Sequence, residues 1–125
     1  MIISTKNAPQ AIGPYSQARK VGNSIYISGC CPFHHIDGSI VGNDIKEQAH
    51  QVMKNLKAIV DASELTMDDV VKTTCFISDM NNFIAFNDVY KSYFNDGIYP
   101  ARSCVEVSRL PKDVLIEVEA VVVKQ

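Results

Sequence analysis

The chain has 125 residues, of which 46% are hydrophobic and 21% charged, and its formal net charge is -2 at pH 7. This length and composition predict one globular domain over residues 1–125. A slightly acidic chain lacks the clustered Lys and Arg that general binding to phosphate backbones requires, so nucleic acid is an unfavourable partner. No run approaches the roughly 18 apolar residues of a membrane span, and the first residues do not resemble a signal peptide, so we expect a cytoplasmic protein without a membrane partner.

An aromatic ring lies early in the chain, in the segment 12–17, Ile-Gly-Pro-Tyr-Ser-Gln. Gly13 and Pro14 constrain the backbone and could fix Tyr15 over a cleft. The alternative is that Tyr15 closes the edge of the core, as tyrosine often does. The sequence leaves both interpretations open.

Two short β-prone runs follow, at residues 18–21 and 24–28. They flank Gly22-Asn23, and two strands around a Gly-Asn pair are typical of a β-hairpin. A further short strand is expected at Ile2-Ile3. The second run is predicted to end at Ser28-Gly29, where a glycine permits close approach of backbone N–H groups to a ligand, although most such glycines only make a turn.

The cysteine count is even, which in a short secreted domain would suggest two disulfides. Without an export signal, free thiols are expected. Cys30-Cys31 beside His34-His35 resembles a zinc-binding composition, but structural zinc sites usually take cysteine pairs separated by two to four residues. We therefore predict no metal site, with small thiols filling core space and the histidines in a turn before Asp37-Gly38.

Two helices are predicted by capping residues and apolar stripes. Asp44 with Glu47 three residues later resembles a capping box, and the stripe that follows fades near Ser63. A second helix is expected after 79–82, whose side chains can cap it, and before the stop signal at 95–97. The first stripe is Ile45, Ala49, Val52, Met53, Leu56, Ile59 and Val60, and the second is Phe83, Phe86, Tyr90 and Phe94.

Three longer strands complete the pattern. Residues 70–78 are rich in β-branched side chains and read as an interior strand, while 102–107 and 114–123 flank a turn at 110–113. The order β-β-α-β-α-β-β predicts an α+β fold with a mixed sheet. Crossovers of the usual right-handed sense in one direction place both helices on the same face of that sheet.

The last strand indicates how the other face is covered. Its side chains alternate, and Leu115, Val121 and Val123 lie opposite the positions expected to meet the helices. An apolar sheet face without helices of its own would be a large exposed patch, and such patches usually mark association. We therefore predict a homo-oligomer packed through that face.

Arg102 and Glu117 are the charged residues most in need of an explanation. Arg102 shares one side of its strand with Cys104 and Glu106. Its guanidinium could bind a ligand carboxylate in a two-point fork, or it could form an internal salt bridge with Glu106, Glu117 or Glu119. Glu117 could transfer protons with a raised pKa, pair with Arg102, or face solvent.

Two further side chains are candidates for a cleft near Arg102. Asn87 in the second predicted helix could reach such a cleft or face water. Cys104 could be a reactive thiolate beside a positive charge, but no histidine is close in sequence to act as a base, so a cleft-lining role is favoured. The chain has no phosphate loop, dinucleotide fingerprint, nucleophile elbow or metalloprotease motif.

Several blocks of the sequence, in order, resemble the Rid (YjgF-like) family, specifically its RidA branch. The strongest is Pro-Ala-Arg-Ser-Cys-Val-Glu-Val at 100–107, continued by Arg-Leu-Pro-Lys-Asp at 109–113 and Ile-Glu-Val-Glu-Ala at 116–120. Supporting matches lie at 7–9, 11–17, 28–29, 71–74, Asn87 and Tyr90. Together they cover nearly the whole chain.

The resemblance implies a chorismate-mutase-like α+β fold and a homotrimer with a central barrel and ligand clefts between subunits. It implies hydrolysis of reactive 2-imino acids, such as 2-iminopropanoate and 2-iminobutanoate, to 2-oxo acids and ammonia, with no cofactor. Carried over by position, Arg102 would hold the substrate carboxylate and Glu117 would activate water. The cleft would be lined by Tyr15, Ser28, Gly29, Asn87 and Cys104.

The chain departs from the family pattern near Gly29. Many relatives have Gln where this chain has Cys30, followed by an apolar residue where it has Cys31, and Val118 replaces a final Ile or Met. These departures concern substrate range. Two alternative functions are a non-catalytic regulator that binds small carboxylates at Arg102 and, less favoured by the acidic composition, a ribonuclease or translation inhibitor.

Overall fold

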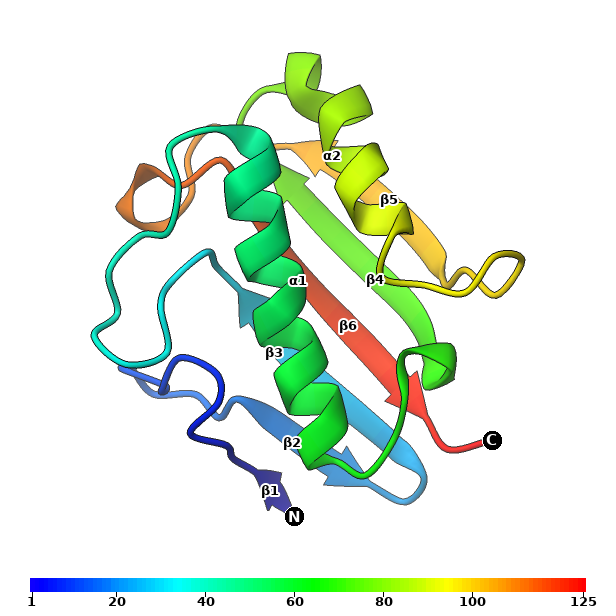
Figure 1. Cartoon of the computed structure of the whole chain (residues 1–125). Coiled ribbons are helices and arrows are strands. Elements are labelled where there is room, and N and C mark those ends of the chain that lie inside the picture. The colour runs from blue at the N-terminus through cyan, green and yellow to red at the C-terminus, as the bar shows by residue number, and fades with distance from the viewer.

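The computed structural model describes all of residues 1–125 and contains one six-stranded sheet and two α-helices (Figure 1). The strands follow the order β1-β2-β3-β6-β4-β5, with β4 and β5 parallel and every other pair antiparallel. This mixed sheet confirms the predicted α+β class. The strands are β1 Ile2–Ile3, β2 Ala18–Val21, β3 Ser24–Cys30, β4 Val70–Ile77, β5 Ala101–Glu106 and β6 Ile116–Val123, and the helices are α1 Ile45–Ala62 and α2 Phe83–Lys91.

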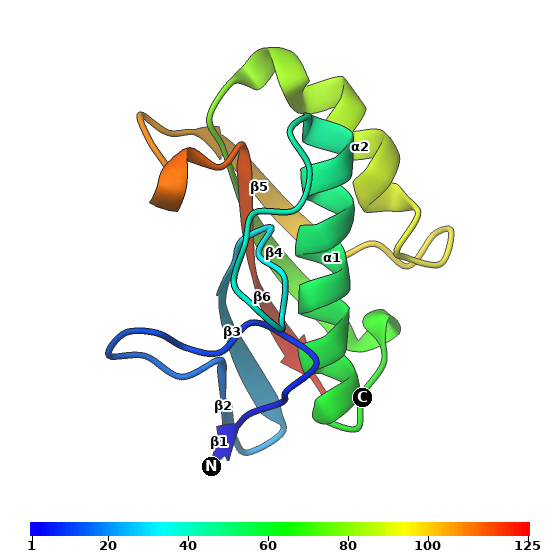
Figure 2. The same cartoon turned by 60° about the vertical axis from the view of Figure 1, so that its left-hand side comes forward.

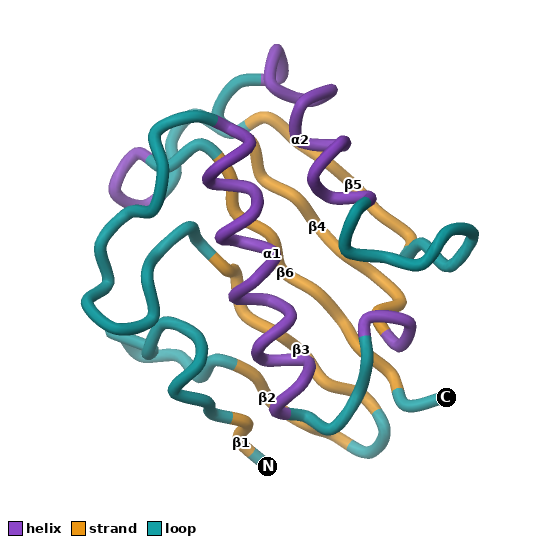
Figure 3. Tube along the Cα trace, viewed as in Figure 1, coloured by secondary structure: helices purple, strands orange, loops and turns teal.

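Both α-helices lie on one face of the sheet, as predicted, and the opposite face has no α-helix (Figure 2). Short 3-10 turns, Met67–Asp69, Met80–Asn82 and Pro111–Asp113, connect the larger elements. Figure 3 shows two long loops, from β1 to β2 and from β3 to α1, on the same side of α1. Neither helix combines the length and the apolar character that crossing a membrane requires.

The first helix begins where its capping residues predict. The side chain of Asp44 accepts a hydrogen bond from the backbone N–H of Glu47 at 2.8 Å. The Glu47 carboxylate in turn accepts from the backbone N–H of Asn43 at 3.1 Å, one residue before the expected position. The second helix ends at Lys91, so Phe94 packs on the core from the following turn.

Alternation along β6 separates the core from the open face. Ile116, Val118, Ala120 and Val122 are buried beneath the helices. The apolar side chains predicted for the opposite face, Leu115, Val121 and Val123, are partly buried within the single chain. Tyr26 and Val105, whose strand partners share that face, remain 51% and 43% exposed. The open face therefore keeps a substantial apolar component.

Two predicted strand boundaries are wrong by two residues, and the boundaries predicted at 78, 102 and 107 are each wrong by one. The run that was expected to stop at Ser28-Gly29 continues to Cys30, and its register against β6 shifts between Ile27 and Cys30. Such a bulge inserts a residue into the ladder and redirects the side chains around it. The last strand begins at Ile116 because Lys112 and Asp113 adopt left-handed backbone angles, with φ of 53° and 59°, which prolong the turn.

A buried amide attaches the loop after β3 to α1. Asn55 is 2% exposed, and its side-chain nitrogen donates to the carbonyl oxygens of Cys31 and Phe33, both at 2.9 Å. Gln51 donates to the Asn55 side-chain oxygen at 2.9 Å and completes its bonding. Buried carbonyls need such donors, since an unpaired buried polar group is destabilising. Asn55 therefore fixes the path of the chain beyond the bulge.

Replacing Asn55 should destabilise the fold more than replacing its exposed neighbour. Asn55→Ala leaves two carbonyl oxygens without their donor, and the free energy of unfolding should fall by about 1–3 kcal/mol. Lys54→Ala, on the outer face of the same helix, should change it by less than about 0.5 kcal/mol. Urea unfolding followed by circular dichroism measures both variants. Equal stabilities would show that the loop does not depend on this amide.

Candidate functional site

Four of the predicted site residues line one pocket of about 680 Å³. They are Tyr15, Ser28, Gly29 and Glu117. The pocket lies among the N-terminal loop, the end of β3, the turn after it and the turn before β6. Ser28 ties two of these segments together, because its hydroxyl donates to the backbone carbonyl of Ser16 at 2.6 Å. Tyr15 is 51% exposed, so it borders the pocket instead of closing the core.

The Glu117 carboxyl group lies directly against the backbone of Gly29. A methyl group placed on Gly29 would overlap that carboxylate and approach its carbon to 2.8 Å. A side chain at position 29 would have to displace the Glu117 carboxylate, so this glycine has the close-approach role and does not merely make a turn. Gly29 lies within the bulge of β3, between Ile27 and Cys30, and Glu117 precedes Val118, the register partner of Cys30.

The surroundings of Glu117 suit a proton acceptor. Burial raises the pKa of this carboxyl group, while the Cys31 thiol opposes the shift by hydrogen bonding to it and Glu119 adds to it by charge repulsion. No Lys, Arg or His forms an ion pair with Glu117 in the chain. Glu117 therefore does not form the internal salt bridge with Arg102 that the sequence left open. Its raised pKa makes it a better base than an exposed glutamate.

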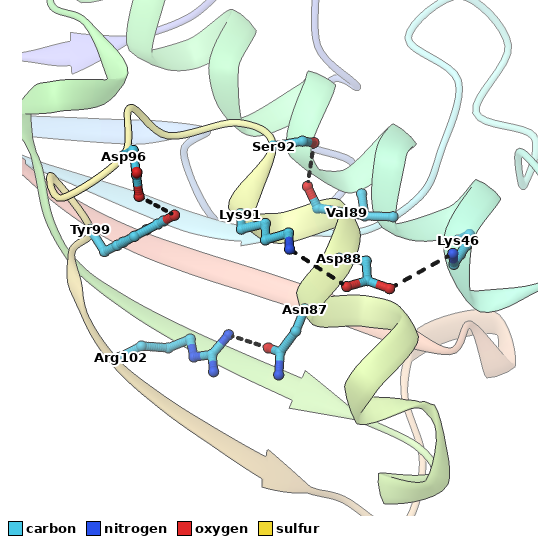
Figure 4. A network of polar contacts seen from close by, with 9 residues as sticks. All are labelled: Lys46, Asn87, Asp88, Val89, Lys91, Ser92, Asp96, Tyr99 and Arg102. Atoms are coloured by element: carbon cyan, nitrogen blue, oxygen red, sulfur yellow. Dashed lines mark hydrogen bonds and ion pairs between the residues drawn. The ribbon is translucent and has the colours of Figure 1, made fainter.

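Arg102 is held on the helix-covered side of β5. One guanidinium nitrogen, Nη1, donates to the side-chain oxygen of Asn87 at 2.7 Å (Figure 4). The guanidinium carbon lies 4.8 Å from the ring centre of Tyr90 and 5.4 Å from that of Phe83. Tyr90 is fixed in turn by a 2.6 Å hydrogen bond between its hydroxyl and that of Thr73. The guanidinium is therefore oriented before any ligand binds.

No carboxylate of the chain pairs with Arg102. Asp88 on α2 faces Lys46 and Lys91 instead, at 3.9 and 4.0 Å (Figure 4). Glu106 accepts a hydrogen bond from the backbone N–H of Met80 at 2.8 Å. An internal salt bridge for Arg102 is thus wrong for the single chain. Its remaining donors are available to a carboxylate ligand.

Arg102 and Glu117 lie on opposite faces of the sheet. Arg102 is paired in register with Thr73 on β4, which is buried beneath α2. Glu117 is paired with Phe76, three residues further along β4. Successive side chains of β4 point to opposite faces, so the two charged groups point away from each other. One chain therefore brings Tyr15, Ser28, Gly29 and Glu117 together but leaves Arg102, Asn87 and Cys104 as a second group.

Cys104 belongs to the Arg102 group and is partly exposed. Burial raises the pKa of its thiol, although the Arg102 guanidinium acts in the opposite direction. This disfavours the reactive-thiolate interpretation and fits a residue that lines the site. Nowhere do three or more His, Cys, Asp or Glu side chains gather as a metal site would require. His34 and His35 stack with ring centres 4.8 Å apart in the turn after β3.

The sequence interpretation assigned the aromatic partners of Arg102 only to the core. Phe83, Asn87 and Tyr90 follow the i, i+4, i+7 spacing of one helical face. The polar Asn87 within this aromatic stripe could have indicated that the face contacts a polar group such as Arg102. The sequence interpretation also missed Cys31, Phe33 and Lys112, which line the Glu117 pocket. No local pattern reveals these three, because segments distant in sequence meet there.

Comparisons with known proteins identify the family of the chain. The sequence model of the Endoribonuclease L-PSP family matches residues 5–124. A protein of Escherichia coli named 2-iminobutanoate/2-iminopropanoate deaminase is 48% identical over 125 residues, which cover 98% of this chain and 97% of that protein.

Two solved structures share the fold along nearly their whole length. A Yersinia pestis protein of unknown function, described as a conserved Rid-family member, superposes with a TM-score of 0.96 at 48% identity, covering 99% of this chain and 98% of its own. Escherichia coli TdcF with bound serine gives a TM-score of 0.94 at 45% identity, covering 100% and 99%. The chain therefore belongs to the Endoribonuclease L-PSP family, that is, to the Rid (YjgF-like) proteins.

Proposed function

We propose that the protein hydrolyses small 2-imino acids, such as 2-iminopropanoate and 2-iminobutanoate, to 2-oxo acids and ammonia. The observation that carries the proposal is the pair of unpartnered charges. Arg102 is oriented by Asn87 and two rings and pairs with no carboxylate, and Glu117 lies in a pocket without forming an ion pair. A substrate with a carboxylate beside an electrophilic carbon matches both. The name of the Escherichia coli relative supports this chemistry.

The two charged groups act together only if two copies of the chain form the site. Arg102, Asn87 and Cys104 would come from one copy, and Glu117, Gly29, Ser28 and Tyr15 from its neighbour. The uncovered sheet face, with Tyr26 and Val105 exposed on it, supplies an apolar surface for such an assembly. We propose a homotrimer with a central barrel and a cleft at each subunit boundary. Serine bound to TdcF is a ligand with the α-carboxylate that Arg102 would hold.

The reaction needs positioning and one proton acceptor. Arg102 binds the substrate carboxylate through a fork of two N–H donors, which fixes the imine carbon near Glu117. As water attacks that carbon, the Glu117 carboxylate accepts a water proton and passes it to the imine nitrogen. In the tetrahedral intermediate the hydroxyl proton moves to the amine nitrogen as the C–N bond breaks, so ammonia leaves and the hydroxyl oxygen becomes the carbonyl of the 2-oxo acid. An imine is already electrophilic, so neither a covalent nucleophile nor a cofactor takes part.

A non-catalytic carboxylate-binding regulator is the second candidate. It is favoured by one observation: the Arg102 group is complete within one chain and does not include Glu117. Binding alone would need only this half. A ribonuclease role is less consistent with a net charge of -2.

Arg102→Lys should weaken binding of a stable product analogue. Lysine keeps the charge but loses the two-point fork and the flat stacking surface. Loss of a charged hydrogen bond of about 1.5–3 kcal/mol predicts that affinity for pyruvate falls roughly tenfold or more. Calorimetric titration measures it, with Arg109→Lys, an exposed arginine paired to Asp113, as the control. Unchanged affinity in Arg102→Lys would place the carboxylate elsewhere.

Glu117→Gln should abolish turnover while retaining pyruvate binding. Loss of general-base assistance typically reduces a rate by about 10²–10⁴-fold. Glu119→Gln, two residues along the same face, should keep the wild-type rate of ammonia release from freshly generated 2-iminopropanoate. Full activity in Glu117→Gln would mean that the assigned base is wrong. Pyruvate binding through Arg102 without any hydrolysis by the wild type would favour the regulator.

The activity of the wild type should fall at acidic pH with a midpoint above the ordinary glutamate value of 4.5, because burial raises the pKa of Glu117 and the reaction needs its ionised form. A raised folded-state pKa means that ionising Glu117 opposes folding. The contribution of Glu117 to the free energy of unfolding is fully present below its unfolded-state pKa and is lost as pH rises through its folded-state pKa. Glu117→Gln should therefore show no loss of thermal stability at neutral pH.

Mixing two inactive variants tests whether the site is shared. Arg102→Ala and Glu117→Gln chains, denatured together and refolded at equal concentrations, should regain about one quarter of wild-type activity, because one in four head-to-tail contacts then has both groups intact. Each variant refolded alone should stay inactive. Light scattering should give a mass well above the 13.8 kDa chain. A mixture that stays inactive although it assembles would place the site within one chain.

A further inference from the structure

Three of the four free cysteines lie in one row across the sheet. Cys30 on β3 is paired in register with Val118 on β6, Val118 with Cys75 on β4, and Cys75 with Cys104 on β5. All members of such a row point to the same face of the sheet. That face is the helix-covered one, where Cys30 and Cys75 are buried in the main core and Cys104 packs against it.

Only one pair in this row can form a disulfide. Neighbouring strands lie about 4.8 Å apart, which is within the 4.4–6.8 Å range of Cα separations in disulfides, so Cys75 and Cys104 meet the backbone requirement. Cys30 and Cys75 are separated by β6, at roughly twice the strand spacing. Cys30 and Cys31 pack into different hydrophobic clusters and so point apart. Because β5 is the edge strand, it can move slightly to bring the two sulfur atoms together.

The two thiols differ in exposure in a way that suits stepwise oxidation. Cys104 is partly exposed, two residues from Arg102, whereas Cys75 is completely buried behind it. A small oxidant therefore reaches Cys104 first. Burial raises the pKa of Cys104 and raises that of Cys75 to about 12, so thiolate is scarce near neutral pH and oxidation should accelerate as pH rises.

We propose that Cys75 and Cys104 are a site of reversible oxidative modification, where a peroxide converts the two thiols into a disulfide that joins β4 to β5. The Cys104 sulfur attacks one peroxide oxygen, the O–O bond breaks, and water leaves with the thiol proton, forming a sulfenic acid. The Cys75 sulfur then attacks the sulfenic sulfur, the S–O bond breaks, and a second water leaves with the remaining proton. Hydrogen peroxide is reduced to two waters as the thiols lose two electrons.

The cross-link would alter the wall of the carboxylate site. Cys104 shares a strand face with Arg102, and Arg102 is paired in register with Thr73, two residues before Cys75. Drawing the Cys104 sulfur toward Cys75 moves it away from the cleft and ties β5 to β4 beside Thr73, which holds Tyr90 against the guanidinium. This consequence rests on the proposed function, whereas the modification itself does not.

The test is peptide mapping of the native protein after treatment with hydrogen peroxide, with thiols blocked by iodoacetamide under denaturing conditions. Two of the four thiols should become inaccessible to alkylation, and one cross-linked peptide pair should contain Cys75 and Cys104 with the mass of two hydrogens lost. Dithiothreitol should restore all four, and the cross-link should form faster at higher pH. Cys75→Val should give no cross-link, and Cys31→Val, a matched control in the other cluster, should form it as the wild type does.

Different outcomes would overturn the proposal. These are oxygen addition at Cys104 while Cys75 stays alkylatable, a cross-link that involves Cys30 or Cys31, and a link between two chains. If Cys75→Val does not fold, Cys104→Ser at the partly exposed position replaces it, and a cross-link that persists there contradicts the assignment. Cross-linking is measured by mass, so it succeeds or fails independently of imine hydrolysis. Pyruvate affinity before and after oxidation then reports on the carboxylate site.

Discussion

The alternation of side chains along β6 is the constraint on which the rest of the structure depends. Ile116 and Val118 must face α1 to be buried, and a strand places the residue between them on the other side. Glu117 is consequently directed away from the helices by the same packing that forms the core. Moving the register by one residue would bury this carboxylate and expose the core, so hydrophobic burial specifies the position of the charged group.

The same rule places Arg102 on the opposite face. Thr73 is buried beneath α2, and its register partner Arg102 shares that face, at the edge where β5 leaves room for a long side chain. Asn87 and the rings of Phe83 and Tyr90 then restrict the guanidinium to one orientation. Fixing an arginine in this way removes rotamer freedom before a ligand arrives, so less entropy is lost on binding.

Two unpartnered charges on opposite faces connect the chemistry to assembly. A buried or partly buried charge is normally paired, yet here the chain supplies the cation and the carboxylate at sites that cannot meet. An apolar open face allows a second copy to approach, and the two halves would then share one cleft. Gly29, within the bulge of β3, belongs to this arrangement, because a side chain there would overlap the Glu117 carboxylate.

The sequence by itself determined the local elements and the residue types of the site. The three-four spacing of α1, the Asp44 cap, the β-branched run at 70–78 and the alternation of β6 each depend on neighbouring residues, so they could be predicted. Arg102 and Glu117 stood out because charged groups interrupt apolar strands. Only the tertiary structure decided that β3 continues through Gly29, that Glu117 forms no ion pair, and that Arg102 lies between rings of α2. These features depend on contacts between segments far apart in the chain, and a local pattern carries no information about which distant segments will meet.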